Sequence, residues 1–363
     1  MNEHERWDAI FSYEEFDRLP IWYFGTWEET RDQWLEQGLS DVSRVPEETG
    51  MDPEWEQGMW DMHGLVNNKP ISDRKQEVIE ETDDHCIVRT SLGAVIKQRK
   101  GGSSIPHHIE EAMKPTRESW EQFKTYLDPT DQSRYAGDWE AKAEELNGRN
   151  RLTCFLGGSL FGWPREWLGP EQILMLSYDD PVLFEEIIDH IADFFMTLYE
   201  PILEKVTFDF AYFFEDCCCR TGPLFSPDCF EEYYAKYYKK MTEFYRRMGV
   251  KWILLDSDGK VDIMIPHWLD AGIDIMFPIE VGAWKADPVE LRKQFGKDLR
   301  MFGGVNKHVI PEGEEAIRTH LEHLKPLVQE GGFIPIPDHR IPPSCSLDEF
   351  RTYVEVFKDV FGG

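Results

Sequence analysis

The sequence has few basic residues and no long apolar segment. Lys and Arg number 39 against 69 Asp and Glu, which gives a formal net charge of −30. Such a chain is repelled by nucleic-acid phosphates and by anionic membranes, so we exclude nucleic acid and lipid as partners. No apolar run approaches the about 20 residues that span a bilayer, and the first residues, MNEHERWDAIFSYEEF, lack a signal-peptide core. We therefore expect a cytoplasmic protein.

Cysteine is scarce and is not arranged as a disulfide framework. There are seven cysteines, an odd number, and Cys217, Cys218 and Cys219 are adjacent. Neighbouring cysteines rarely pair with each other, so the pattern fits a reducing compartment. The triplet could be a metal or redox site, but we favour small buried residues at a strand end. A Gly-rich dinucleotide fingerprint is also absent after every expected strand, which disfavours a Rossmann-type fold.

Strands and helices alternate regularly in the second half of the chain. The apolar run FDFAYFFED has strand length, and in the helix that follows Ser226 suits the cap, Pro227 the first turn and Gly249 the end. The later strands are expected in KWILLDSDG, IDIMFPIE, LRMFGGVNK and FIPIPDH, each followed by a helical segment. Short connections in such an alternation predict parallel strands with right-handed crossovers.

Polar side chains stand at the carboxyl end of each of these strands. They are Glu215, Asp216, Asp256, Asp258, Glu280, Asn306, Asp338 and His339. In a closed barrel they converge on one site, whereas in an open sheet they spread along an edge. We predict an α/β fold, a (β/α)8 TIM barrel forming one domain over residues 1–363, whose first strand is PIWYFGTW (20–27). Residues of about 30–150 form an irregular helical or inserted region that could cover the barrel mouth.

Several of these segments resemble the uroporphyrinogen decarboxylase superfamily, and in particular its cobalamin (corrinoid)-dependent methyltransferase branch. The matching pieces include FFEDCCCRTGPLFSPDCFEEYYAKYYKKM, LLDSDGKVDIMIPHWLDAGIDIMFPIEVGA, FGGVNK, GGFIPIPDHRIPPSCSLDEF and the N-terminal RWDAIFSYEEFDRLPIW. The resemblance covers most of the chain, but is thin between residues 30 and 150. It implies the barrel fold more specifically than the reaction, because members of one fold perform different chemistry.

Two departures from the family patterns narrow the expected reaction. The decarboxylases carry an arginine just after the first-strand Pro-x-Trp, but here Trp22 is followed by Tyr-Phe-Gly-Thr-Trp. Decarboxylation of uroporphyrinogen is therefore not expected. The thiol-alkylating methyltransferases bind zinc through His-x-Cys and a later cysteine, but here the corresponding places hold Asp256-Ser257-Asp258 and Asp338-His339. Oxygen ligands make a harder centre than thiolates, or no metal site, which argues against a thiol as methyl acceptor.

The resemblance implies a methyltransferase that moves a methyl group between a small substrate and a corrinoid on a separate small protein. We expect demethylation of a small methylated compound, such as an aromatic methyl ether, with an acid or Lewis acid activating the leaving atom. Cobalamin on the corrinoid-binding partner is the expected cofactor, and zinc is a second candidate. Related barrels often dimerise, so a homodimer is also expected by analogy.

The catalytic and binding roles are assigned within that hypothesis. We expect His339, Glu215 and Asp258 to be catalytic, and Asp256, Glu280 and His339 to be the metal ligands, if a metal is bound. Trp22, Tyr23 and Asn306 are the expected substrate contacts.

Each of these positions also has a plain structural reading. His339 could satisfy a loop carbonyl, DSDG is good turn chemistry, Glu280 could form a salt bridge, and Asn306 could cap a turn. Two other classes of function stay open: a lyase or metal-dependent enzyme on another small organic substrate, and a non-catalytic member that binds a small molecule.

Overall fold

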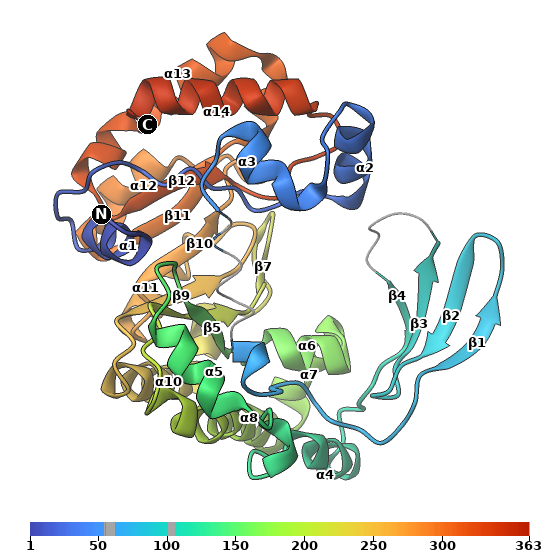
Figure 1. Ribbon diagram of the computed structural model, residues 1–363. Coiled ribbons are helices and arrows are strands. Elements are labelled where there is room, and N and C mark those ends of the chain that lie inside the picture. The colour runs from blue at the N-terminus through green and yellow to red at the C-terminus, as the bar shows by residue number, and fades with distance from the viewer. Residues whose placement is uncertain (54, 56–61, 101–105, 363) are drawn as a thin grey trace.

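A six-stranded parallel sheet forms the centre of the computed structural model, which describes residues 1–53, 55, 62–100 and 106–362. The strand order is β12-β11-β10-β9-β6-β5 (Figure 1). The strands are β5 (Cys154–Gly158), β6 (Phe210–Phe214), β9 (Trp252–Asp256), β10 (Ile275–Ile279), β11 (Arg300–Val305) and β12 (Phe333–Pro337). β9, β10 and β12 are buried along their whole length, as parallel strands covered by helices should be.

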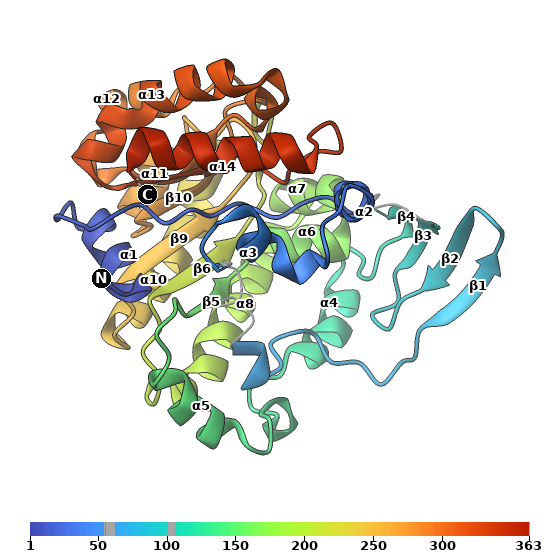
Figure 2. The same cartoon turned by 45° about the horizontal axis from the view of Figure 1, so that its top comes forward.

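Helices pack around the outside of this sheet, as Figure 2 shows from a second direction. They are α6 (Gly162–Leu168), α7 (Pro170–Asp179), α8 (Pro181–Leu203), α9 (Pro227–Cys229), α10 (Ala235–Arg247), α11 (Ile265–Asp270), α12 (Pro288–Phe295), α13 (Glu314–Glu330) and α14 (Leu347–Phe361). The predicted signals hold: the Ser226 side chain accepts from the backbone N–H of Cys229, and Gly249 takes a positive φ. Between α9 and α10 the chain forms a π-helix over Phe230–Tyr234.

The expected first strand is an extended segment rather than a strand. It joins the barrel through one parallel bridge, Thr26 to Ile341, just after β12. Earlier in the same segment, the Ile21 N–H donates to the Asp52 carboxylate at 2.9 Å, and the Ile21 carbonyl accepts from the Asp52 N–H. Because these backbone groups are used by Asp52, they are not available for a neighbouring strand. The fold is a TIM barrel in which, among the described residues, six strands form the wall and this extended segment adjoins its β12 side.

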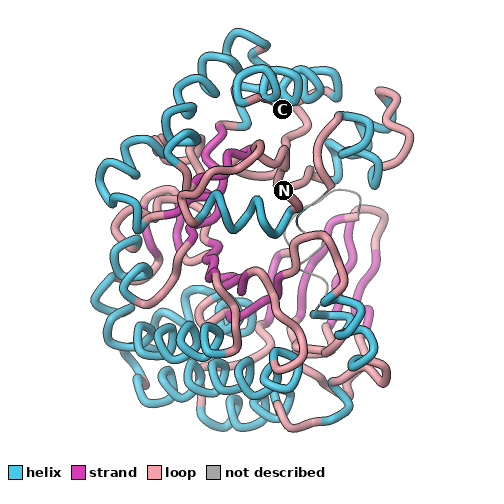
Figure 3. Tube along the Cα trace, turned by 60° about the vertical axis from the view of Figure 1, so that its left-hand side comes forward, coloured by secondary structure: helices cyan, strands magenta, loops and turns pink. Residues whose placement is uncertain are grey.

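Aromatic rings fill the inside of the barrel. Trp7 stacks on Phe210 with ring centroids 4.7 Å apart, and Trp55 lies 5.0 Å from Phe302 and 5.2 Å from Phe277. Trp7 belongs to α1 (Glu3–Phe11), which lies across the strands in Figure 3. The interior is therefore a packed core and not a pore. Because α1 packs at one end of the barrel, the opposite end is the place where a site is expected.

The region of about 30–150 is more regular than expected. It contains the helices α2 (Glu28–Glu36), α3 (Val45–Thr49), α4 (Arg117–Lys124) and α5 (Trp139–Asn147), the 3-10 turn η3 (Met62–Gly64) and an antiparallel sheet. The strands β1 (Glu77–Glu81), β2 (His85–Arg89), β3 (Val95–Arg99) and β4 (His107–Glu110) pair in sequence order. This four-stranded arm projects from the body in Figure 1. A hairpin turn that includes Leu92 and Gly93 connects β2 and β3. Among the described residues, no helix combines the length and apolar character needed to cross a membrane.

Candidate active site at the carboxyl ends of the strands

The side chains of His339 and Asp258 meet at the barrel mouth. His339 follows β12 and Asp258 follows β9, and the Nε2 atom of His339 lies 3.2 Å from Oδ2 of Asp258. The imidazole stacks on Trp27 with ring centroids 5.6 Å apart and meets the ring edge of Phe24 at 5.5 Å. Only 18% of the His339 side chain is exposed. The structure thus brings together two of the three predicted catalytic residues.

The DSDG sequence (256–259) contains the last residue of β9, Asp256, and the turn that follows it. Asp256 is buried and its carboxylate accepts from the Tyr212 hydroxyl of the neighbouring strand β6. Gly259 has a φ of +81°, and a Cβ there would lie 2.6 Å from the Cys219 backbone, so only glycine fits this turn. The tight turn that follows keeps Asp258 at the rim, where it meets His339.

Glu280 extends the group of acids at the rim. Its Oε2 atom accepts from the Gly259 N–H at 2.8 Å, and burial raises the pKa of its carboxyl group, with Asp258 adding a smaller increase. Burial also raises the pKa of Asp216, whose Oδ2 atom is held 2.7 Å from Arg165. We call Asp216, Asp258, Glu280 and His339 the mouth cluster. A group of carboxyls and one imidazole in this setting can hold and transfer a proton.

Glu215, the third predicted catalytic residue, is fully buried at the start of α6. Its two carboxylate oxygens accept from the backbone N–H groups of three consecutive residues at 2.7–3.0 Å, and from the Tyr238 hydroxyl at 2.5 Å. The three N–H groups are those of Leu160, Phe161 and Gly162. The contacts of Glu215 are therefore structural: it anchors the first turn of α6 to the end of β6.

The predicted substrate contacts lie mostly outside the mouth cluster. Trp22 and Tyr23 are 3% and 5% exposed, and their rings pack on Phe302 and Phe350 in the core. The Oδ1 atom of Asn306 accepts from the His308 N–H, so Asn306 caps the 3-10 helix η8 (Lys307–Glu312). Trp22 and Tyr23 are thus covered by rings of the core, whereas Asn306 is used by the local backbone.

The comparisons with known proteins fit this geometry. Residues 96–360, more than half of the chain, match the model of the family described as uroporphyrinogen decarboxylase (URO-D). The chain belongs to the uroporphyrinogen decarboxylase family. No curated protein matches it significantly. Among solved structures, a methyltransferase from Methanosarcina mazei is similar over 99% of both chains, with a TM-score of 0.62 and 13% identity. At this identity, the likeness shows the shared fold alone.

Several residues at the barrel mouth of this uroporphyrinogen decarboxylase family member were not predicted from the sequence. Phe24 and Trp27 hold His339, and the guanidinium of Arg340 lies over the same two rings, at 5.5 and 5.9 Å from their centroids. A cation thus stands beside the first segment although that segment itself carries no arginine. Tyr212 was also missed, although the alternation along β6 places it on the same face as Phe210.

The expected zinc ligands do not form a metal centre in the described part of the chain. No three His, Cys, Asp or Glu side chains are gathered there as a metal-binding group. Asp256 is engaged by Tyr212, Glu280 by the Gly259 N–H, and His339 by Asp258. A zinc site therefore carries no step in the function proposed below.

The adjacent cysteines have different environments. Cys217 and Cys218 are buried, and their backbone N–H groups both donate to the Ser257 hydroxyl at 3.1 and 3.2 Å. Cys219 is exposed. The reading as small buried residues therefore fits two of the three positions.

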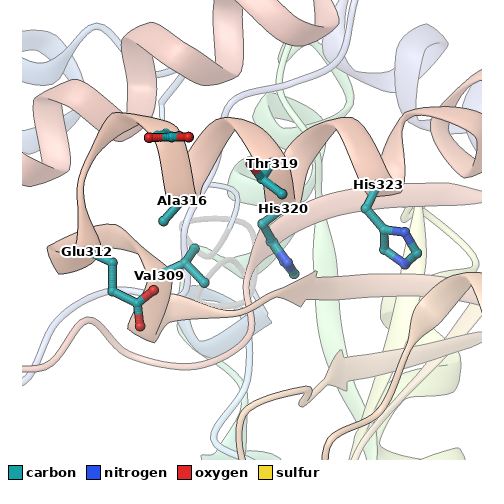
Figure 4. A pocket seen from close by; sticks show the side chains of 7 residues that line it. Val309, Glu312, Ala316, Thr319, His320 and His323 are labelled. Carbon is teal, nitrogen blue, oxygen red and sulfur yellow. The ribbon is translucent and has the colours of Figure 1, made fainter.

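A large hollow lies on the outside of the barrel, along α13 (Figure 4). It has a volume of about 700 Å³ and contains His320 and His323. The Nε2 atom of His320 accepts from the Asn306 N–H, and His323 pairs with Asp287. None of the mouth-cluster residues lines this hollow, so it is separate from the candidate site.

Proposed function

We propose that this protein is a corrinoid-dependent methyltransferase that takes a methyl group from a small methylated substrate, such as an aromatic methyl ether. The observation that carries the proposal is the His339–Asp258 pair, held between aromatic rings at the carboxyl ends of the strands. The family match and the printed name of the similar structure support it. A small corrinoid-binding protein is the proposed partner and methyl acceptor, and a homodimer is the proposed assembly.

The reaction needs a proton at the leaving atom. A reduced corrinoid supplies a nucleophilic cobalt that accepts the methyl group. When the methyl–oxygen or methyl–nitrogen bond breaks, its electron pair stays on the heteroatom, and protonated His339 donates a proton from its ring to that atom. The Asp258 carboxylate stabilises the protonated imidazole and fixes its orientation. Phe24 and Trp27 exclude water from the ring faces, which strengthens the ion pair.

Glu280 is placed to restore the proton. It shares the Asp258 neighbourhood, and burial raises the pKa of its carboxyl group, so it holds a proton at higher pH than an exposed glutamate. A protonated Glu280 can return a proton to the Asp258–His339 pair after each turnover.

The direct test is methyl transfer to a reduced corrinoid protein, followed by the cobalt absorbance, with a panel of methoxy and methylamine compounds. The wild-type protein should methylate the corrinoid with at least one donor. The variant His339→Gln should lower the rate by roughly 10²–10⁴-fold, the usual contribution of a general acid. The control His323→Gln, an exposed histidine on α13, should keep the wild-type rate.

Two results would contradict this function. A His339→Gln variant as fast as the wild type would remove His339 as the acid. No cobalt response over the whole panel, together with release of CO2 from a small acid, would favour the alternative of a lyase, in which the same histidine protonates a carbanion.

A further inference from the structure

A second hollow, of about 580 Å³, borders the barrel mouth. It is lined by residues of three neighbouring segments: the hairpin formed by β7 (Cys218–Cys219) and β8 (Gly222–Pro223), the loop after β9, and the loop after β10. Nothing in the proposed function uses it. The hollow is close to the mouth cluster in the chain, because its lining residue Lys260 is two positions after Asp258.

The lining of this hollow is basic, in a chain with a formal net charge of −30. Arg220, Lys260 and Lys285 line it, and no acidic side chain does. The only ion pair of these three cations in the described part of the chain is a long one, Lys260 to Asp262 at 3.8 Å. Three positive charges facing one cavity repel each other, and a bound anion relieves that repulsion.

Backbone contacts fix the two loops that carry Arg220 and Lys260 to each other. The Lys260 N–H donates to the Cys219 carbonyl at 2.9 Å, and Gly259 packs directly on the Cys219 backbone, so the loop after β9 is fixed to the hairpin that carries Arg220. On the other side, the Gly259 N–H binds Glu280, at the end of β10. The tight turn at Gly259 therefore sets both the mouth cluster and the basic hollow.

Trp284 adds an aromatic ring to the lining of the hollow. Lysine and arginine side chains that face one cavity donate charge-assisted hydrogen bonds, which is the chemistry that recognises a carboxylate or a phosphate.

We propose that this basic hollow binds the anionic group, a carboxylate or a phosphate, of the small substrate, while the reacting end of that substrate lies at Asp258 and His339. The link to the reaction rests on the proposed function, whereas anion binding itself does not. Two residues of extended chain span at most about 7 Å, so Lys260 and Asp258 are within the length of one aromatic acid. The substrate is thus a methylated acid rather than a neutral compound.

Calorimetric titration at low ionic strength with two probes, benzoate and inorganic phosphate, tests this proposal. The wild-type protein should bind at least one, and the tighter one identifies the anion. The double variant Arg220→Gln/Lys260→Gln should weaken binding at least about tenfold, because hydrogen bonds to charged groups are lost. The matched control Lys293→Gln/Arg318→Gln removes the same two charges from exposed ion pairs on α12 and α13 and should bind as the wild type does.

The single variant Lys285→Gln keeps the test valid if the double variant does not fold, and it should also weaken binding. If the wild type binds neither probe, or if the control loses as much affinity as the hollow variants, the proposal is wrong. Binding without any methyl transfer would contradict the proposed function alone. With an active methoxy acid as donor, the hollow variants should raise KM and leave kcat nearly unchanged.

Discussion

Glu215 is a buried carboxylate whose partners are hydrogen-bond donors and not a cation. Burial raises the pKa of its carboxyl group, while the hydrogen bonds from Tyr238 and from the start of α6 act in the opposite direction. Asp258, in contrast, keeps a partly exposed side chain and a histidine partner. The two acids follow neighbouring strands, but Glu215 is enclosed by hydrogen-bond donors whereas Asp258 lies beside His339 at the mouth.

Replacing Glu215 should therefore reduce stability more than an ordinary surface change. The variant Glu215→Gln turns one acceptor oxygen into an NH2 group that faces backbone donors, so we expect the free energy of unfolding to fall by roughly 1–3 kcal/mol, or more if the group was ionised. Urea unfolding followed by circular dichroism measures the loss. The exposed Glu121→Gln on α4 is the control, expected to change stability by less than about 0.5 kcal/mol. Equal midpoints for both variants would contradict a structural role.

The sequence predicted the surroundings of some site residues and not of others. The ion pair of His339 and Asp258 was anticipated because both follow strands whose ends must meet in a barrel. The role of Glu215 could not be read from the chain, because its partners, Tyr238 and the start of α6, lie 23 or more positions away. For Asn306 the sequence left a substrate contact and a turn cap open, and its Oδ1 atom caps the turn. Phe24 and Trp27 were visible only as aromatic residues, without the imidazole that they enclose.

The helix α1 is tied to the bottom of the barrel by the Asp8–Lys251 ion pair and by the contact of His4 with Asp209. His4 Nδ1 lies 2.7 Å from Asp209 just before β6, and His4 Nε2 lies 3.1 Å from the Arg149 carbonyl. The hydrogen bond to Asp209 raises the pKa of His4 above 6.5. Protonated His4 therefore helps to hold α1, and with it Trp7, against the ends of the strands.

This pair should make stability depend on pH. Because the folded-state pKa of His4 is raised, its stabilisation is complete below pH 6.5 and is lost as pH rises through the folded-state value. The difference in urea midpoint between wild type and His4→Gln should shrink from about pH 5 to about pH 8. Burial lowers the pKa of His63, His190 and His320 and gives the opposite trend, but these groups are common to both proteins. A constant difference across this range would rule out the ion pair.

Local signals explain why most helices and central strands were predicted and the first segment was not. Caps such as Ser226 and Ser346 act within three residues, so a short window of sequence reveals them. The segment around Ile21 carries the apolar residues of a strand, but its hydrogen bonds depend on Asp52, 31 positions away. A short window of sequence therefore cannot show that Asp52 takes the hydrogen bonds that a neighbouring strand would make.

The four-stranded arm has its own small apolar cluster, formed by Val88, Ala94 and Ile96 and separate from the main core. β1 and β2 lie before the residues that match the family. The arm edge is also unusually apolar, with Val78, Ile79 and Ile109 each about half exposed. The separate cluster and the exposed apolar side chains show that the arm is not part of the core of the barrel.

Removal of the arm should leave the barrel folded. The ends of β1 and β4 are three strand spacings apart, roughly 15 Å, so a flexible linker of about eight Gly and Ser residues can replace residues 76–111. We expect cooperative thermal unfolding with a midpoint within a few degrees of the wild type. An insoluble or non-cooperative product would show instead that the arm completes the core. If the arm covers the mouth, the same variant should lose methyl transfer while keeping its fold.

The bridge between Thr26 and Ile341 joins two parts of the chain that a ribosome makes at opposite times. Until Ile341 has emerged from the exit tunnel, Thr26 has no bridge partner. The tryptophan-rich N-terminal segment then has no neighbouring chain after β12 to pack against. The nascent polypeptide must therefore wait with a large aromatic surface uncovered, a state that chaperones recognise. Slow translation or a late stop codon should thus endanger this protein through aggregation before any loss of catalysis is felt.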